Sequence, residues 1–269
     1  GQRLGIDRIY DYASRFGLGK RSGLDLTHES PGLFPSSAWK KKHFAGTDQA
    51  QWFPGETLSV AIGQGATMVT PLQMAVAMSA LVNGGKVYRP YLVQAVLSGD
   101  GKEVVEKGAP KLESELQVSE SVLQSVRAGL ESVVNNPEGT ARRAQLPKNW
   151  GITTAGKTGT SQVVALSKKK DSEKDTEHHA WFVGYAPAEN PEIVVATLVE
   201  HGGGGGLVAA PVVRQVFEAY FKKTRGLKLP EEEEFERAQA EGQAHLPNPP
   251  SSPEENPPQN EQSSGGPLP

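Results

Sequence analysis

The sequence predicts an α+β protein, a mixed α/β arrangement in which helices flank an antiparallel sheet. Three runs rich in β-branched and aromatic residues indicate the sheet, at about 152–165, 180–186 and 192–200. Short links join these runs, and strands with short links pair antiparallel because parallel strands need a longer crossover. Stretches with apolar residues at helical spacing lie before and after the runs and supply the flanking helices.

Five helices are expected from apolar residues at helical spacing. The clearest begins after Thr70, a capping residue followed by Pro71 at the first helical position, and it ends before Asn83. A shorter helix follows Ser36 or Ser37, either of which can cap it. The expected helices cover about residues 6–16, 36–44, 71–82, 119–136 and 210–223.

The segments between the helices are expected to be hairpins and loops. Two β-prone runs around Gly99-Asp100-Gly101 predict a hairpin within residues 91–108. The charged insert LSKKKDSEKDTEHH predicts a flexible loop, and the five-glycine run predicts a mobile one.

The end of the chain differs in composition from the rest. From Pro230 onward it holds nine of the twenty prolines and nine glutamates, with Arg237 as the single basic residue. This stretch carries 1 − 9 = −8 of the total charge of −3, which leaves about +5 on residues 1–229, too mildly basic to indicate nucleic-acid binding. We expect residues 1–225 to fold and residues 226–269 to form an acidic, proline-rich disordered tail.

Several classes of site are excluded or disfavoured by the residues present. The chain has no cysteine, which rules out disulfides, thiolate catalysis and zinc–thiolate sites. No apolar run approaches the roughly 18 residues of a membrane-spanning helix. His178-His179 lack the spacing of a zinc motif, so a solvated loop is the favoured interpretation. We expect neither a metal nor a cofactor.

One stretch admits two incompatible interpretations. Residues 151–164 read GITTAGKTGTSQVV, which satisfies the nucleotide-binding pattern G-x-x-x-x-G-K-[ST] from Gly151 to Thr158. That pattern needs a buried strand before its first glycine and a helix beginning at Lys157. The preceding RRAQLPKNW is polar and contains proline, and the following GTSQVVAL favours a strand. A strand that carries the motif Lys-Thr-Gly is therefore the better interpretation.

A strand at this position suits the binding of a peptide. Lys157 and Gly159 point to one face of the strand, and Thr158 and Thr160 point to the other. An edge strand offers unpaired backbone groups to an extended peptide, and glycine allows close approach. Lysine supplies positive charge, threonine hydroxyls bind carboxylates, and a backbone N–H beyond the glycine stabilises an oxyanion. A bare Lys-Thr-Gly triplet also arises by chance on exposed strands, so the rest of the chain must decide.

Four segments occur in order along the chain: GQGATMVTPLQMA (63–75), NPEGTARRA (136–144), AGKTGTSQ (155–162) and HAWFVGYAP (179–187). Together they resemble the transpeptidase domain of class B penicillin-binding proteins, and the elongation-specific branch more than the division-specific one. The resemblance covers about residues 1–223. It implies the fold of that family and of serine β-lactamases, an antiparallel sheet flanked by helices. It also implies serine acyl transfer from the D-Ala-D-Ala ends of peptidoglycan stem peptides, and binding of β-lactam antibiotics.

The resemblance implies roles for the residues of the strand. Lys157 and Thr160 would be catalytic, and Lys157, Thr158, Gly159 and Thr160 would bind substrate. Thr160 would give its hydroxyl to the substrate carboxylate and its N–H to the oxyanion hole. The GQG and TPLQ segments would be scaffold elements near the site. Implied partners are a membrane glycosyltransferase and scaffold proteins of the elongation machinery, in the bacterial periplasm or at the outer face of the cytoplasmic membrane.

The chain departs from the family pattern in its nucleophile. The family uses a serine in Ser-x-x-Lys and a Ser-x-Asn motif. No Ser-x-Asn occurs here, and Ser-x-x-Lys occurs only as Ser37–Lys40 and Ser167–Lys170, both at the wrong place in the family order. We expect this chain to be the C-terminal portion of the domain, with the nucleophile and a membrane anchor upstream of Gly1. The chain alone is expected to be inactive.

Two alternatives stay open. One is a non-catalytic interaction protein on the same fold, and the other is a carboxypeptidase or β-lactamase that uses the same strand. The match of the four segments favours a biosynthetic transpeptidase over the carboxypeptidase or β-lactamase. An upstream Ser-x-x-Lys at a helix start would identify the parent protein as an enzyme.

Overall fold

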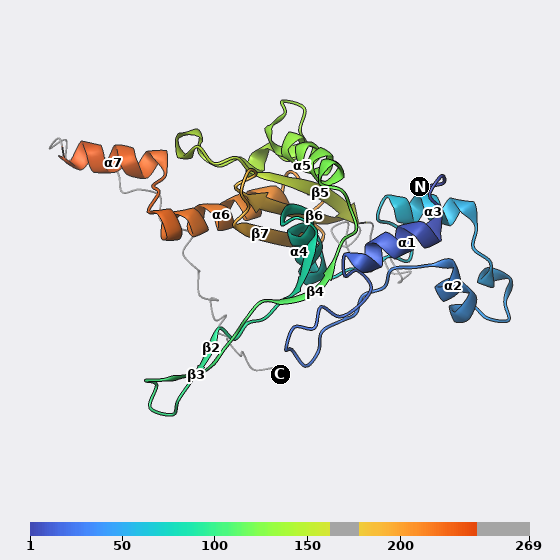
Figure 1. The fold of residues 1–269 in the computed structure, drawn as a ribbon. Coiled ribbons are helices and arrows are strands. Elements are labelled where there is room, and N and C mark those ends of the chain that lie inside the picture. Colours follow the sequence, from blue (N-terminus) through green and yellow to red (C-terminus); the bar gives the residue numbers. More distant parts are fainter. Residues whose placement is uncertain (162–177, 241–269) are drawn as a thin grey trace, which may run out of the picture. The chain divides into compact units, whose positions relative to one another are not determined.

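The computed structural model describes residues 1–161 and 178–240 (Figure 1). Its contacts divide the chain into two units, residues 1–225 and 226–269. The described part of the second unit holds helix α7, Pro230–Ala240, in the first part of the stretch expected to be a disordered tail. Most of the charged insert and the end of the acidic tail, both expected to be flexible, lie outside the described residues.

The sheet contains the three strands that the sequence predicts. β5 (Ala155–Ser161), β6 (His179–Ala186) and β7 (Ile193–Val199) are antiparallel and lie in the order β5-β6-β7. The register places Gly159 opposite Trp181. Within the described part of the chain β5 is an edge strand, and the prediction of a strand at the Lys-Thr-Gly motif is confirmed.

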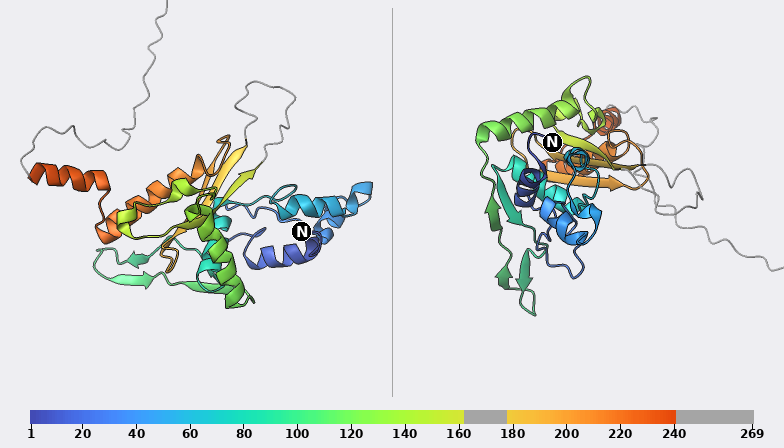
Figure 2. Two further views of the ribbon diagram at one scale, coloured as in Figure 1. Left: turned by 90° about the horizontal axis from the view of Figure 1, so that it is seen from above. Right: turned by 90° about the vertical axis from the view of Figure 1, so that its right-hand side faces the viewer.

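Helices cover both faces of this sheet (Figures 1 and 2). α4 (Pro71–Val82) and α5 (Glu120–Asn135) pack on the face to which Val183 and Tyr185 of β6 point. α6 (Ala209–Arg225) packs on the opposite face. Burial raises the pKa of Tyr185 to about 12, so its phenol stays neutral inside the core.

The start of α4 shows why the helix forms where the sequence predicts it. Thr70 Oγ1 accepts a hydrogen bond from the Gln73 N–H, and Gln73 Oε1 accepts one from the Thr70 N–H at 2.9 Å. Pro71 occupies the first helical position. The Gln73 amide also donates to the carbonyl oxygens of Lys20 and Pro31 at 2.7 and 2.8 Å. This buried side chain therefore ties α4 to the preceding loop with its polar atoms satisfied.

α6 buries a narrower face than its sequence predicts. The spacing of apolar residues in the sequence predicts a buried face of Val212, Val213, Val216, Phe217 and Tyr220, but Val212 and Val216 are 40% and 39% exposed. Val213 and Phe217 are fully buried as predicted, and Phe221, which was not predicted, continues the same line at positions i, i+4 and i+8. Because α6 packs against a single face of the sheet, only a narrow stripe of its surface is buried. In α5, the same spacing predicts Val122 and Val126 to be buried, but they are 50% and 39% exposed.

Two further strand pairs extend away from the three-stranded sheet (Figure 2). β2 (Ala95–Leu97) and β3 (Val104–Lys107) form the predicted hairpin, with Gly101 at a φ of 72° in its turn. β1 (Lys86–Arg89) pairs antiparallel with β4 (Lys111–Glu115). The sequence did not predict this second pair, because both strands are short and mostly polar.

The N-terminal helices form a group beside the sheet (Figure 1). α1 (Ile6–Arg15) and α2 (Ser37–His43) confirm the prediction, and the Ser36 hydroxyl caps α2 by accepting from the Trp39 N–H at 3.0 Å. α3 (Pro54–Ala61) was not predicted. In residues 1–161 and 178–240, no helix combines the length and apolar character needed to cross a membrane. Short 3-10 helices lie at Asp48–Ala50 (η1), Arg142–Ala144 (η2) and Lys148–Trp150 (η3).

A largely enclosed ion pair joins α2 to α3. Lys40 Nζ lies 2.5 Å from Glu56 Oε2, and the two side chains are 8% and 38% exposed. Lys40 Nζ also lies 5.0 Å from the ring centroid of Phe53. Burial by itself raises the pKa of Glu56, but hydrogen bonds from Lys40 and the Phe53 N–H, together with the Lys40 charge, lower it below the usual 4.5.

We predict that Lys40→Met lowers the free energy of unfolding by about 1–2 kcal/mol at neutral pH, because Glu56 loses its partner charge. The partial exposure of Glu56 keeps this loss below that of a fully buried pair. Since the folded-state pKa of Glu56 is lowered, its contribution is present above pH 4.5 and is lost as the pH falls below that value. The difference in unfolding free energy between wild type and Lys40→Met should therefore be smaller below pH 4.5 than at neutral pH. Urea unfolding in each of these two conditions measures it.

Lys41→Met is the matched control, because Lys41 lies next to Lys40 on α2 but is exposed. Its stability should equal that of the wild type at each pH, since an exposed lysine contributes little. Equal stabilities of the two variants at neutral pH would contradict a stabilising role for the ion pair.

Candidate functional site

The Lys-Thr-Gly residues lie on the unpaired edge of β5. Lys157 and Thr160 are exposed, and Thr158 is half-buried. The Thr158 carbonyl accepts a hydrogen bond from Lys157 Nζ at 2.8 Å, and the Thr160 carbonyl accepts one from Gln64 Nε2 at 3.1 Å. The N–H and C=O groups of one strand residue point to the same side, so Thr158 and Thr160 present the free edge of the strand.

Gln64 brings the GQG segment against β5. The segment follows α3 in a turn in which Gly63 and Gly65 have φ values of 77° and 74°, in the left-handed region that favours glycine. The Gln64 N–H donates to the Ser59 carbonyl at 2.8 Å, which fixes the turn to the end of α3. The sequence places this segment near the site only by resemblance and gives Gln64 no role, because a contact across 96 residues leaves no local signature.

A pair of hydroxyls joins β5 to the NPEGTARRA segment. Thr140 Oγ1 lies 3.0 Å from Thr158 Oγ1, and Lys157 Nζ lies 3.5 Å from the same Thr158 oxygen. The segment follows α5, and the Ala141 N–H donates to the Val133 carbonyl at 2.9 Å. The end of α5 therefore fixes the position of Thr140 beside the strand. Sequence reasoning missed this residue, although it belongs to one of the four ordered segments.

The five-glycine run packs closely on this corner of the sheet. A Cβ atom on Gly206 would lie 1.8 Å from the Thr140 carbonyl oxygen, and one on Gly205 would lie 2.1 Å from the Trp181 carbonyl oxygen. A Cβ atom cannot lie so close to a carbonyl oxygen, so both positions require glycine. A Cβ on Gly204 would meet nothing nearer than 3.7 Å. The sequence predicts a mobile loop here, and the structure gives two of its glycines a packing role.

Histidines lie at the end of β5 next to the charged insert. His179 is the first residue of β6 and pairs with Ser161, whereas the sequence favours a solvated loop there. Its Nδ1 accepts from the His201 N–H at 3.0 Å, and the two rings are 4.8 Å apart. The Trp181 indole donates to Ser161 Oγ at 3.3 Å. Within the described ranges, no three His, Asp or Glu side chains gather to hold a metal ion.

Ser37 and Lys40, one of the two Ser-x-x-Lys pairs, have separate partners. The Ser37 N–H and hydroxyl donate to the two carboxylate oxygens of Asp7 at 2.9 and 2.7 Å. Lys40 Nζ is held by Glu56. An activated serine needs a base within hydrogen-bond reach of its hydroxyl, and here the lysine is engaged elsewhere. The other pair, at 167–170, lies outside the described residues.

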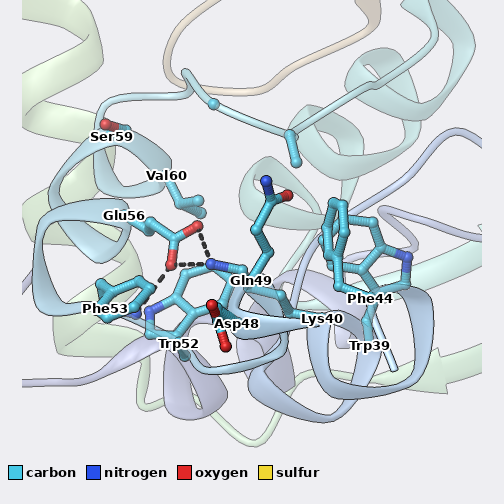
Figure 3. A pocket seen from close by; sticks show the side chains of 12 residues that line it. Trp39, Lys40, Phe44, Asp48, Gln49, Trp52, Phe53, Glu56, Ser59 and Val60 are labelled. Atoms are coloured by element: carbon cyan, nitrogen blue, oxygen red, sulfur yellow. Dashed lines mark hydrogen bonds and ion pairs between the residues drawn. The ribbon is translucent and has the colours of Figure 1, made fainter. Parts of the chain in front are cut away.

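A cavity of about 430 Å³ lies between α2, η1 and α3 (Figure 3). Lys40 and Glu56 point toward each other at its wall, so their charges satisfy one another. The rim includes Gly65, the neighbour of the residue that contacts β5. The cavity therefore borders α3, the helix whose end holds the GQG turn. Its aromatic lining is Trp39, Phe44, Trp52 and Phe53.

Comparison with known proteins agrees with this arrangement. Residues 1–218 match the family model described as "Penicillin binding protein transpeptidase domain". The chain is 34% identical over 238 residues to the peptidoglycan D,D-transpeptidase MrdA of Haemophilus influenzae, and the match covers 86% of this chain and 35% of the relative. The chain thus spans about a third of the length of this curated relative.

Two solved structures of penicillin-binding protein 2 are similar to the fold described above. The protein of Pseudomonas aeruginosa, in complex with WCK 5153, matches with a TM-score of 0.67 and 36% identity, over 86% of this chain and 45% of that one. The protein of Helicobacter pylori, in complex with MreC, matches with a TM-score of 0.63 and 30% identity, over 81% and 36%. Since the family model matches most of the chain, this chain belongs to the family of penicillin-binding protein transpeptidase domains.

Proposed function

We propose that the chain forms the Lys-Thr-Gly wall of the active site in a peptidoglycan D,D-transpeptidase. The observation that carries this proposal is the free edge of β5, which presents Lys157 to Thr160 in a chain of the transpeptidase family. An extended stem peptide that ends in D-Ala-D-Ala can add to such an edge through its backbone. A β-lactam, which also carries a carboxylate beside a reactive carbonyl, would bind at the same place.

Each residue of the motif has a chemical task in this proposal. Lys157 supplies positive charge toward the terminal carboxylate, and the exposed Thr160 hydroxyl donates to it. The Thr160 N–H points to the free edge, where it can stabilise the oxyanion of an attacked carbonyl. Gly159 keeps the surface of the strand open to close approach. Thr158 contributes a second hydroxyl, held in place by its neighbours.

The nucleophile comes, we propose, from outside these 269 residues. The chain contains no Ser-x-Asn, and the hydroxyl of Ser37 is bound to Asp7 instead of to a lysine. In the reaction a serine oxygen forms an ester with the carbonyl carbon of the penultimate D-alanine, and the amide bond to the terminal D-alanine breaks. An amino group of a second stem peptide then replaces the serine and completes the cross-link.

We also propose partners and a location for the parent protein. The H. pylori protein was solved with MreC, which supports a scaffold protein as a partner for the parent of this chain. A membrane glycosyltransferase of the elongation machinery is proposed on the family resemblance. The substrate lies in the cell wall, so we propose that the parent protein works in the periplasm, at the outer face of the cytoplasmic membrane.

We predict that the 269-residue chain alone does not label covalently with fluorescent penicillin, because Ser37 and Lys40 are not arranged as an activated nucleophile and its base. A longer protein that includes an upstream Ser-x-x-Lys should label. Gel fluorescence and peptide mapping of both proteins provide the measurement. Labelling of the short chain at Ser37, abolished by Ser37→Ala, would place the nucleophile within this chain instead.

We predict that Lys157→Met in the longer protein lowers the second-order rate of acylation by at least about tenfold, because a charge-assisted hydrogen bond to the carboxylate is lost. Lys148→Met is the control, since Lys148 is exposed on η3, and its rate should match the wild type. Stopped-flow measurement with penicillin gives the rates. Unchanged acylation in Lys157→Met would remove Lys157 from the site. In a separate assay with a stem peptide that ends in D-Ala-D-Ala, release of D-alanine without cross-linked product would identify the longer protein as a carboxypeptidase.

A further inference from the structure

We infer that Thr140 is a positioning residue that orients the Thr158 hydroxyl toward the substrate carboxylate. This inference rests on the proposed function for its consequence in catalysis, but its structural part stands on the contact between the two side chains. Thr140 Oγ1 lies 3.0 Å from Thr158 Oγ1, and either oxygen can donate. None of the roles assigned to the Lys-Thr-Gly strand includes Thr140.

The direction of this hydrogen bond follows from what each group can offer. A hydroxyl donates one proton and accepts up to two, and an ammonium group only donates. Lys157 Nζ, 3.5 Å from Thr158 Oγ1, can therefore only donate toward that oxygen. A bound carboxylate only accepts, so it selects the arrangement in which Thr158 donates outward. Thr140 must then donate to Thr158, because the Thr158 proton is already used.

Thr140 is held firmly enough to have this effect. The Ala141 N–H donates to the Val133 carbonyl at 2.9 Å, and the Gly139 N–H donates to the Asn136 carbonyl at 2.8 Å, so the backbone on both sides of Thr140 is fixed. The Thr140 carbonyl is covered by Gly206, where a Cβ would lie only 1.8 Å away. The glycine loop and the end of α5 thus clamp Thr140 from two directions.

A purely structural role explains the pair less well. Thr140 is exposed, and a hydrogen bond between two partly exposed hydroxyls contributes little to stability. Valine has the same branched shape and would fill the same space. The Thr140 hydroxyl therefore acts mainly on the direction of the Thr158 O–H bond. Thr140→Val removes this hydroxyl but keeps the packing of the side chain, so it tests the orienting role alone.

The first test follows the Thr158 side chain itself, in the isotopically labelled 269-residue chain. Three-bond couplings to the Thr158 methyl carbon should report one χ1 rotamer in the wild type, averaged rotamers in Thr140→Val, and one rotamer again in Thr140→Ser. Gly206→Ala, which displaces the Thr140 carbonyl, should also cause averaging, whereas Gly204→Ala should not. Unchanged couplings in Thr140→Val would overturn the inference whether or not the protein is a transpeptidase.

The second test measures acylation by penicillin in the longer protein, as a double-mutant cycle. Thr140→Val should lower the second-order rate about fivefold, mainly by raising the penicillin concentration needed for half-saturation, and Thr140→Ser should restore it. In a Thr158→Val background Thr140→Val should have no further effect, because Thr140 acts through the Thr158 hydroxyl. Thr224→Val, on the distant end of α6, is the matched control.

The outcomes of the two tests are separable. A wild-type longer protein that fails to label contradicts the proposed function, while the rotamer measurement still decides whether Thr140 orients Thr158. A protein that labels, with an equal loss from Thr140→Val in both backgrounds, would show that Thr140 acts independently of Thr158 and would overturn the inference.

Discussion

Strand β6 is the constraint on which the rest of the structure depends. It is hydrogen-bonded to β5 on one edge and to β7 on the other, and most of its residues from Ala180 to Ala186 are buried. Helices pack against both of its faces, so its position cannot shift without disturbing two layers. The register with β6 fixes the orientation of Lys157 and Thr158 in turn, because each residue of β5 is placed by its partner.

The loops around β5 hold the side chains on the outer edge of this strand in place. The sheet sets the direction of the strand, but the side chains on its outer edge have no neighbouring strand to hold them. Three segments far apart in the sequence converge there, through Gln64, Thr140 and Gly206. Each segment is anchored to the end of a helix or of the sheet, which lets short loops hold a rigid arrangement. Two of these segments, which contain Gln64 and Thr140, belong to the four that carry the family resemblance, and the folded protein brings both of them to β5.

The sequence predicts those parts of the fold that local chemistry decides. The cap at Thr70 and the proline after it set the start of α4, and β-branched residues set β5, β6 and β7. Local pattern does not decide which line of a helix faces the sheet, so Val216 was expected in the core and Phe221 is found there. The site was predicted along β5, and the resemblance placed the GQG segment near it, but the residues that contact the strand were not predicted. The contacts of Gln64 and Thr140 depend on tertiary packing, which no periodicity or motif spacing records.

An open sheet edge is a hazard as well as a binding surface, because any unpaired strand can add to it. On the free edge of β5, the Thr158 and Thr160 carbonyls are occupied by donors from Lys157 and Gln64. A strand from another protein molecule would have to displace both donors and would gain only ordinary backbone hydrogen bonds in return. A short peptide with a terminal carboxylate would also attract the displaced lysine. The same two side chains would thus disfavour strand addition from another molecule at this edge of the sheet, while a ligand that attracts Lys157 could still bind there.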